Sequence, residues 1–61
     1  MDNKTNDMIR YAAFRSFLEK GYEATNIRDI CKAVDIKAPS LYFYYSSKQE
    51  LFFRIYEDIW I

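Results

Sequence analysis

Apolar residues recur along this chain with the spacing of amphipathic helices. The first such pattern predicts a helix over about residues 4–20, and charged residues occupy the intervening positions. Its expected core-facing residues are Ile9, Ala12, Ala13, Phe17 and Leu18. Gly21, the only glycine, can take the left-handed conformation that ends a helix, and Tyr22 then falls where it can pack back on Phe17.

A second helix is predicted over about residues 26–34. Its apolar residues follow the i, i+3, i+4, i+7 spacing: Ile27, Ile30, Cys31 and Val34. Thr25 is a good N-cap residue, and Asp35 tolerates the positive φ of a helix end better than most residues. Because Cys31 lies on the apolar stripe, we interpret it as a small buried hydrophobe, with a redox-sensitive thiol as the alternative.

Two further helices follow a tight turn. Pro39 suits the first turn of a helix over about residues 38–45, because its missing N–H would have no partner there. Ser47 and Glu50 have the spacing of a capping box, in which Ser47 accepts from the Glu50 amide and Glu50 reaches back to Ser47. This predicts a fourth helix from about residue 48, with an apolar side formed by Leu51, Phe52, Ile55, Tyr56 and Ile59.

Four consecutive aromatic residues, 42–45, lie in the predicted third helix and cannot all face one core. At about 100° per residue, Leu41 and Tyr45 share the inward side, while Phe43 lies nearly opposite. Tyr42 and Tyr44 fall on the two flanks. A lone exposed phenylalanine is common on protein surfaces, but this one shares its face with other candidate contact residues.

Those neighbours make the outward face typical of a helix-turn-helix reader of duplex DNA. The Phe43 ring can pack on a thymine methyl group and Ser40 can hydrogen-bond to several base edges, while tyrosine hydroxyls and lysines suit phosphates. Lys37 opposes the helix dipole at a cost of about 0.3 to 1 kcal/mol, and a bound phosphate would reverse that effect. Lys48 begins the fourth helix in the same unfavourable position, which indicates a phosphate contact.

Composition excludes several other classes. The 61 residues are 51% hydrophobic and 20% aromatic, too apolar for a disordered segment, and a chain this short forms one small domain at most. One cysteine and no histidine leave no internal disulfide and no zinc site, so we expect no metal and no cofactor. No apolar run or leader pattern indicates a membrane span or a signal peptide, so we expect a soluble cytoplasmic protein.

The charges are balanced overall but unevenly distributed. The chain has nine basic and nine acidic residues, and a zero net charge argues weakly against nucleic acid. Residues 25–48, however, carry four basic and two acidic residues, whereas residues 49–61 carry one basic and three acidic residues. The basic excess therefore coincides with the aromatic segment, where a polyanion would bind.

Two segments resemble the TetR-type transcriptional regulators, a family of helix-turn-helix proteins. They are "AAFRSFLEKGYEATNIRDI" from Ala12 to Ile30 and "IKAPSLYFYYSSKQEL" from Ile36 to Leu51, in the family's order and spacing. The resemblance implies an all-α fold, a three-helix, homeodomain-like helix-turn-helix domain plus the start of a fourth helix. Residues 1–61 would form one DNA-binding domain.

The resemblance also implies roles for individual residues. The third helix would enter the major groove, with backbone contacts from Tyr42, Tyr44 and Lys48 and helix-two contacts from Thr25 and Arg28. The variable reading face, together with the start of the third helix, would comprise Lys37, Ala38, Pro39, Ser40 and Phe43. Asp35, Lys37 and Tyr45 depart from the family pattern, which usually has a turn glycine, a capping Ser or Thr, and Phe at these positions.

By resemblance, the parent protein would be a bacterial repressor that binds a palindromic operator as a homodimer. A further C-terminal domain, absent from these 61 residues, would hold a small-molecule inducer and the dimer interface. The alternative is a protein-interaction module with an aromatic patch of Phe43, Tyr42 and Trp60. An enzyme is not expected, because the chain lacks histidine, convincing paired carboxylates and a phosphate-binding glycine loop.

Overall fold

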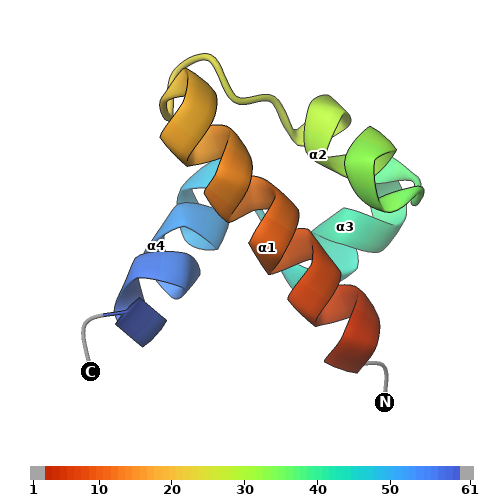
Figure 1. Cartoon of the computed structure of the whole chain (residues 1–61). Helices are drawn as coiled ribbons and strands as arrows, with labels where there is room; N and C mark the ends of the chain where they lie inside the picture. The colour runs from red at the N-terminus through yellow and green to blue at the C-terminus, as the bar shows by residue number, and fades with distance from the viewer. Residues whose placement is uncertain (1–2, 60–61) are drawn as a thin grey trace.

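The computed structural model describes residues 3–59, which fold into four α-helices with no strand in that range (Figure 1). The helices are α1 (Asn3–Lys20), α2 (Ile27–Val34), α3 (Ala38–Tyr44) and α4 (Lys48–Ile59). This confirms the all-α class, while α2 begins and α3 ends one residue inside the predicted ranges. Trp60 lies outside the described residues.

All four helical segments contribute to one core, with α1 packed against both α2 and α4 and with α3 packed against α2. In Figure 1, α1 crosses the front of the molecule, with α2 on one side and α4 on the other. The buried apolar residues are Ile9, Ala13, Phe17, Ile30, Cys31, Val34, Leu41, Tyr45, Leu51 and Ile55. Cys31 is therefore a core residue, as the apolar stripe predicted.

Leu18 was predicted to face the core, and this is wrong because its side chain is 63% exposed. It is nine residues from the fully buried Ile9, which places it about 180° away around α1. Phe14, absent from the predicted stripe, packs partly buried against the core instead. The prediction failed because Leu18, although adjacent to the buried Phe17, is turned a further 100° away from Ile9 and so leaves the core side.

The end of α1 has the predicted geometry. Gly21 has φ 90°, and its amide donates to the Phe17 carbonyl at 3.0 Å. The Tyr22 ring stacks on Phe17 with ring centroids 5.6 Å apart, and Phe52 of α4 meets both rings edge-on. The turn after α1 therefore joins the aromatic packing between α1 and α4.

Thr25 was predicted to cap α2, but the N-cap residue is Asn26, whose side chain makes no capping hydrogen bond. Thr25 is fully buried, and its hydroxyl donates to the Gly21 carbonyl at 2.8 Å. Its side chain therefore closes the α1–α2 loop on itself. At the other end of α2, Asp35 takes the left-handed conformation with φ 59°, as predicted for that turn.

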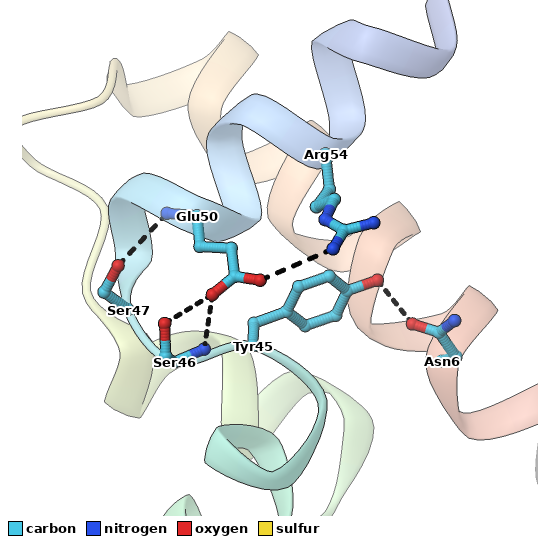
Figure 2. Close-up of polar contacts among 6 residues, drawn as sticks. All are labelled: Asn6, Tyr45, Ser46, Ser47, Glu50 and Arg54. Atoms are coloured by element: carbon cyan, nitrogen blue, oxygen red, sulfur yellow. Dashed lines mark hydrogen bonds and ion pairs between the residues drawn. The ribbon is translucent and has the colours of Figure 1, made fainter.

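Figure 2 shows the junction between α3 and α4, where the capping box is confirmed in one half only. The Ser47 hydroxyl oxygen accepts from the Glu50 amide at 3.1 Å. The Glu50 carboxylate, however, accepts from the amide of Ser46 at 3.1 Å and from the Ser46 hydroxyl, and it does not reach Ser47. The Tyr45 hydroxyl donates to the Asn6 side-chain oxygen, which ties this junction to α1.

Replacing Gly21 by Ala is expected to lower the free energy of unfolding by about 1–2 kcal/mol, because an L side chain is disfavoured at positive φ. The cost comes from the backbone, since a Cβ at Gly21 would meet nothing within 4 Å. Urea unfolding followed by circular dichroism measures it. Glu23→Ala, an exposed change in the same loop, is the control, and equal effects of the two substitutions would contradict this account.

Replacing Glu50 by Gln is expected to lower the free energy of unfolding more at neutral pH than in acid. Hydrogen bonds from Ser46 lower the pKa of the Glu50 carboxyl below its ordinary value of 4.5. The folded chain then binds fewer protons than the unfolded chain, so the stabilisation is present above pH 4.5 and lost as pH falls through the folded pKa. Urea unfolding across the acid range, with Glu57→Gln as control, tests this. A stability difference that is independent of pH would refute it.

Candidate nucleic-acid interface

The aromatic residues of α3 divide between the core and the surface. Leu41 is fully buried and Tyr45, which follows the helix, is 6% exposed. Phe43 is 84% exposed and Tyr42 is 48% exposed, while Tyr44 is half-buried. The predicted inward and outward sides of this helix are therefore confirmed.

The N-terminal half of α3 presents small and polar groups to solvent. Ala38, Pro39 and Ser40 are all exposed, and Pro39 lies in the first turn. Lys37 is the exposed N-cap residue, and its side chain makes no capping hydrogen bond. The positive charge of Lys37 is thus available at the edge of this surface.

A polar hollow of about 630 Å³ adjoins α3 and lies where α2 and α4 begin. Its lining residues are Thr25, Asn26, Ile27, Arg28, Asp29, Tyr42, Ser46, Ser47 and Lys48. The first backbone amides of a helix have no partner within the helix and carry the positive end of its dipole. The hollow therefore collects two helix N-termini, and Tyr42 connects it to the exposed side of α3.

Lys48 crosses from the start of α4 to the α1–α2 loop. Its ammonium donates to the carbonyl oxygens of Tyr22 at 2.8 Å and Thr25 at 3.0 Å, and it lies 4.4 Å from the centroid of the Tyr22 ring. An ammonium has three donors, so these two bonds leave one. The carbonyls and the ring offset the repulsion between this cation and the positive end of the α4 dipole.

The other predicted contact residues near the hollow differ in accessibility. The Arg28 side chain is exposed, and the neighbouring Asp29 pairs with Lys20 at 3.5 Å. Two cations, Arg28 and Lys48, therefore line a hollow whose one carboxylate already has a cationic partner. Thr25 contributes to the wall but is fully buried, and its hydroxyl already donates within the loop.

The described residues offer little for catalysis or metal binding. They contain no group of three or more side chains suited to hold a metal ion. Cys31 is 5% exposed, and burial raises the pKa of its thiol, which disfavours the reactive thiolate. Nor does any helix in the described range have the length and apolar character needed to cross a membrane.

Comparison with known proteins identifies the family. Residues 9–55 match the sequence model of the bacterial regulatory proteins of the tetR family, and this range covers most of the chain. The chain belongs to the TetR family. The matched range covers α2 and α3 in full, and nothing in the comparisons supports a protein-interaction module instead.

Individual TetR-family relatives are transcriptional regulators. Over 52 residues, 85% of this chain, the sequence is 42% identical to the biofilm operon icaADBC HTH-type negative transcriptional regulator IcaR of Staphylococcus epidermidis, covering 28% of that protein. Over 46 residues, 75% of this chain, it is 44% identical to IcaR of Staphylococcus aureus strain Newman, covering 25%. The chain thus spans about a quarter of the length of these curated relatives. No solved structure matches it significantly.

Sequence reasoning missed the contacts that shape the hollow. Lys48 and Tyr22 are 26 residues apart, and no local pattern predicts that a lysine will bind loop carbonyls at that distance. Asn26 was also missed as the start of α2, because Thr25 satisfies the same N-cap preference. The available signal was that Thr25 and Asn26 are both candidate N-cap residues, so the sequence allowed two helix starts one residue apart.

Replacing Lys48 by Met is expected to lower the free energy of unfolding by about 1–2 kcal/mol, because two carbonyl oxygens lose a charged donor while the aliphatic stem is kept. Thermal and urea unfolding measure the loss. Lys32→Met removes an exposed cation from α2 and serves as the control, with a change within about 0.5 kcal/mol. Equal stability of the Lys48 variant and the original chain would show that these bonds contribute nothing.

Proposed function

We propose that this chain is the operator-binding part of a bacterial transcriptional repressor, with α3 lying in the major groove of duplex DNA. The observation that carries the proposal is the continuous surface running from Phe43 through Tyr42 into the hollow at the starts of α2 and α4. An exposed helix beside a cationic hollow matches a groove beside a phosphate backbone.

The base edges would be read from the exposed side of α3. Pro39, Ser40 and Phe43 lie on that side, and Ala38 is exposed at the start of the helix. A hydroxyl can donate or accept at several base edges, and apolar groups contact thymine methyls. These four residues are accordingly assigned to sequence selection.

The phosphates would be held by the residues around that side. Arg28 and Lys37 are exposed cations, and Tyr42 and Tyr44 carry hydroxyls on the flanks of α3. A phosphate in the hollow would accept from the amides of Ile27 and Arg28, which come before the first amide that bonds to the Asn26 carbonyl, and Asn26 provides no side-chain cap. These contacts would set the position of α3 without selecting sequence.

The roles proposed for Lys48 and Thr25 differ from the direct DNA contacts that the resemblance implied. Two donors of the Lys48 ammonium serve the α1–α2 loop, so a phosphate contact would use the remaining donor. Thr25 is buried and bonded to Gly21, so we assign it to holding the loop that leads into α2. Both residues would then support the phosphate hollow from its walls.

The family and its relatives support the wider assignment. The matched relatives are negative transcriptional regulators by name and about four times the length of the segment that matches, which supports a repressor with further chain beyond this domain. We propose that this parent acts in the cytoplasm as a homodimer on a palindromic operator. A small-molecule inducer would bind outside these 61 residues and release the DNA.

Selection of preferred duplexes from a random pool, using the intact regulator, tests the function directly. Arg28→Ala is expected to weaken binding to all duplexes alike and to reduce the salt slope of log affinity by about 0.9, the effect of one phosphate contact. Arg15→Ala is the control, since Arg15 pairs with Glu19 on α1 outside the hollow. Failure to select any sequence, or binding that does not respond to salt, would refute the proposal.

A further inference from the structure

The side chains on the exposed side of α3 are chemically restricted. Within Ala38–Tyr44 there is no guanidinium, ammonium, amide or carboxylate group. Guanine is most often read by Arg or Lys, adenine by Asn or Gln, and cytosine by Asp or Glu. The helix assigned to the major groove therefore lacks the usual bidentate readers and offers mainly apolar surface.

Phe43 dominates that apolar surface. At 84% exposure it exceeds the other exposed large hydrophobic residues in the described range, of which Tyr11 at 64% is the next. Its ring meets the Tyr44 ring edge-on, with centroids 5.3 Å apart and planes at 88°. Tyr44 itself packs against the core, so the Phe43 ring has a defined position from which to contact a base.

Pro39 and Phe43 form two walls of one apolar slot. They are four residues apart, so they are neighbours on one side of α3. Both line a hollow of about 480 Å³, together with Thr5, Ile36, Ser40 and Tyr44. The apolar group that a base edge presents in the major groove is the 5-methyl group of thymine.

We propose that the slot between Pro39 and Phe43 reads the 5-methyl group of a pyrimidine in each half-site of the operator, with Phe43 as the specificity-determining residue. This rests on the DNA-binding function proposed above. The methyl group would lie against the Phe43 ring, and Ser40 would hydrogen-bond to an adjacent base edge. A 5-methylcytosine presents the same group at the same place, so the chemistry recognised is the methyl group itself.

Replacement of single thymidines by deoxyuridine in the selected operator tests the slot, because it removes only the methyl group. At one position in each half-site the intact regulator is expected to lose about fourfold in affinity per half-site, the effect of unburying about one methyl-sized group. The Phe43→Ala variant should bind thymidine and deoxyuridine duplexes equally. Two control variants should still bind the thymidine duplex more tightly than the deoxyuridine duplex. Phe43→Leu keeps an apolar contact, and Tyr42→Phe leaves the slot intact.

A second experiment distinguishes recognition of the methyl group from recognition of the adenine that pairs with thymine. At the sensitive position a C·G pair should weaken binding, and 5-methylcytosine paired with guanine should recover about fourfold of the loss. Sequence-specific binding with no deoxyuridine effect at any position would overturn the slot and leave the proposed function standing. If the intact regulator showed no sequence-specific binding at all, both the methyl-reading slot and the proposed function would be overturned. Since Phe43 is exposed, circular dichroism of the Phe43→Ala variant should match that of the original chain.

Discussion

The orientation of α3 depends on the burial of two side chains four residues apart. Leu41 and Tyr45 enter the core, and the Tyr45 hydroxyl reaches Asn6 on α1. With seven residues, α3 is too short to hold a fixed orientation by its backbone hydrogen bonds alone. Anchoring one side fixes the other, so Phe43 is turned outward by the same packing that buries Leu41.

This constraint is visible in the sequence, which is why the helical segments and the inward and outward sides of α3 could be predicted. Periodicity at about 100° per residue separates Phe43 from Leu41 without any structural information. The same method misplaced Leu18, because two adjacent apolar residues gave no reason to prefer one of them. Pattern analysis thus identifies a buried side but does not define its edges.

The choice among competing hydrogen-bond partners could not be predicted from residue type and spacing. Thr25 has the residue type of an N-cap, yet tertiary packing buries it and leaves Asn26 at the helix start. Glu50 has capping-box spacing, yet its carboxylate bonds to Ser46. Lys48 was expected at a phosphate, and its first partners are loop carbonyls. Each difference arises where several partners compete for one group, and the observed partner follows from the folded arrangement of the chain around that group.

The bonds of Lys48 also join α4 to the α1–α2 loop. They join the first residue of α4 to the residues that lead directly into α2, and the ring of Tyr22 lies beside the same ammonium. A tilt of α4 that kept these bonds would move the start of α2 with it. A tilt that broke them would leave the Lys48 ammonium and two carbonyl oxygens without these hydrogen bonds. One side chain therefore ties together the two helix starts that line the hollow, so the distance between them depends on the position of α4 as well as on that of α2.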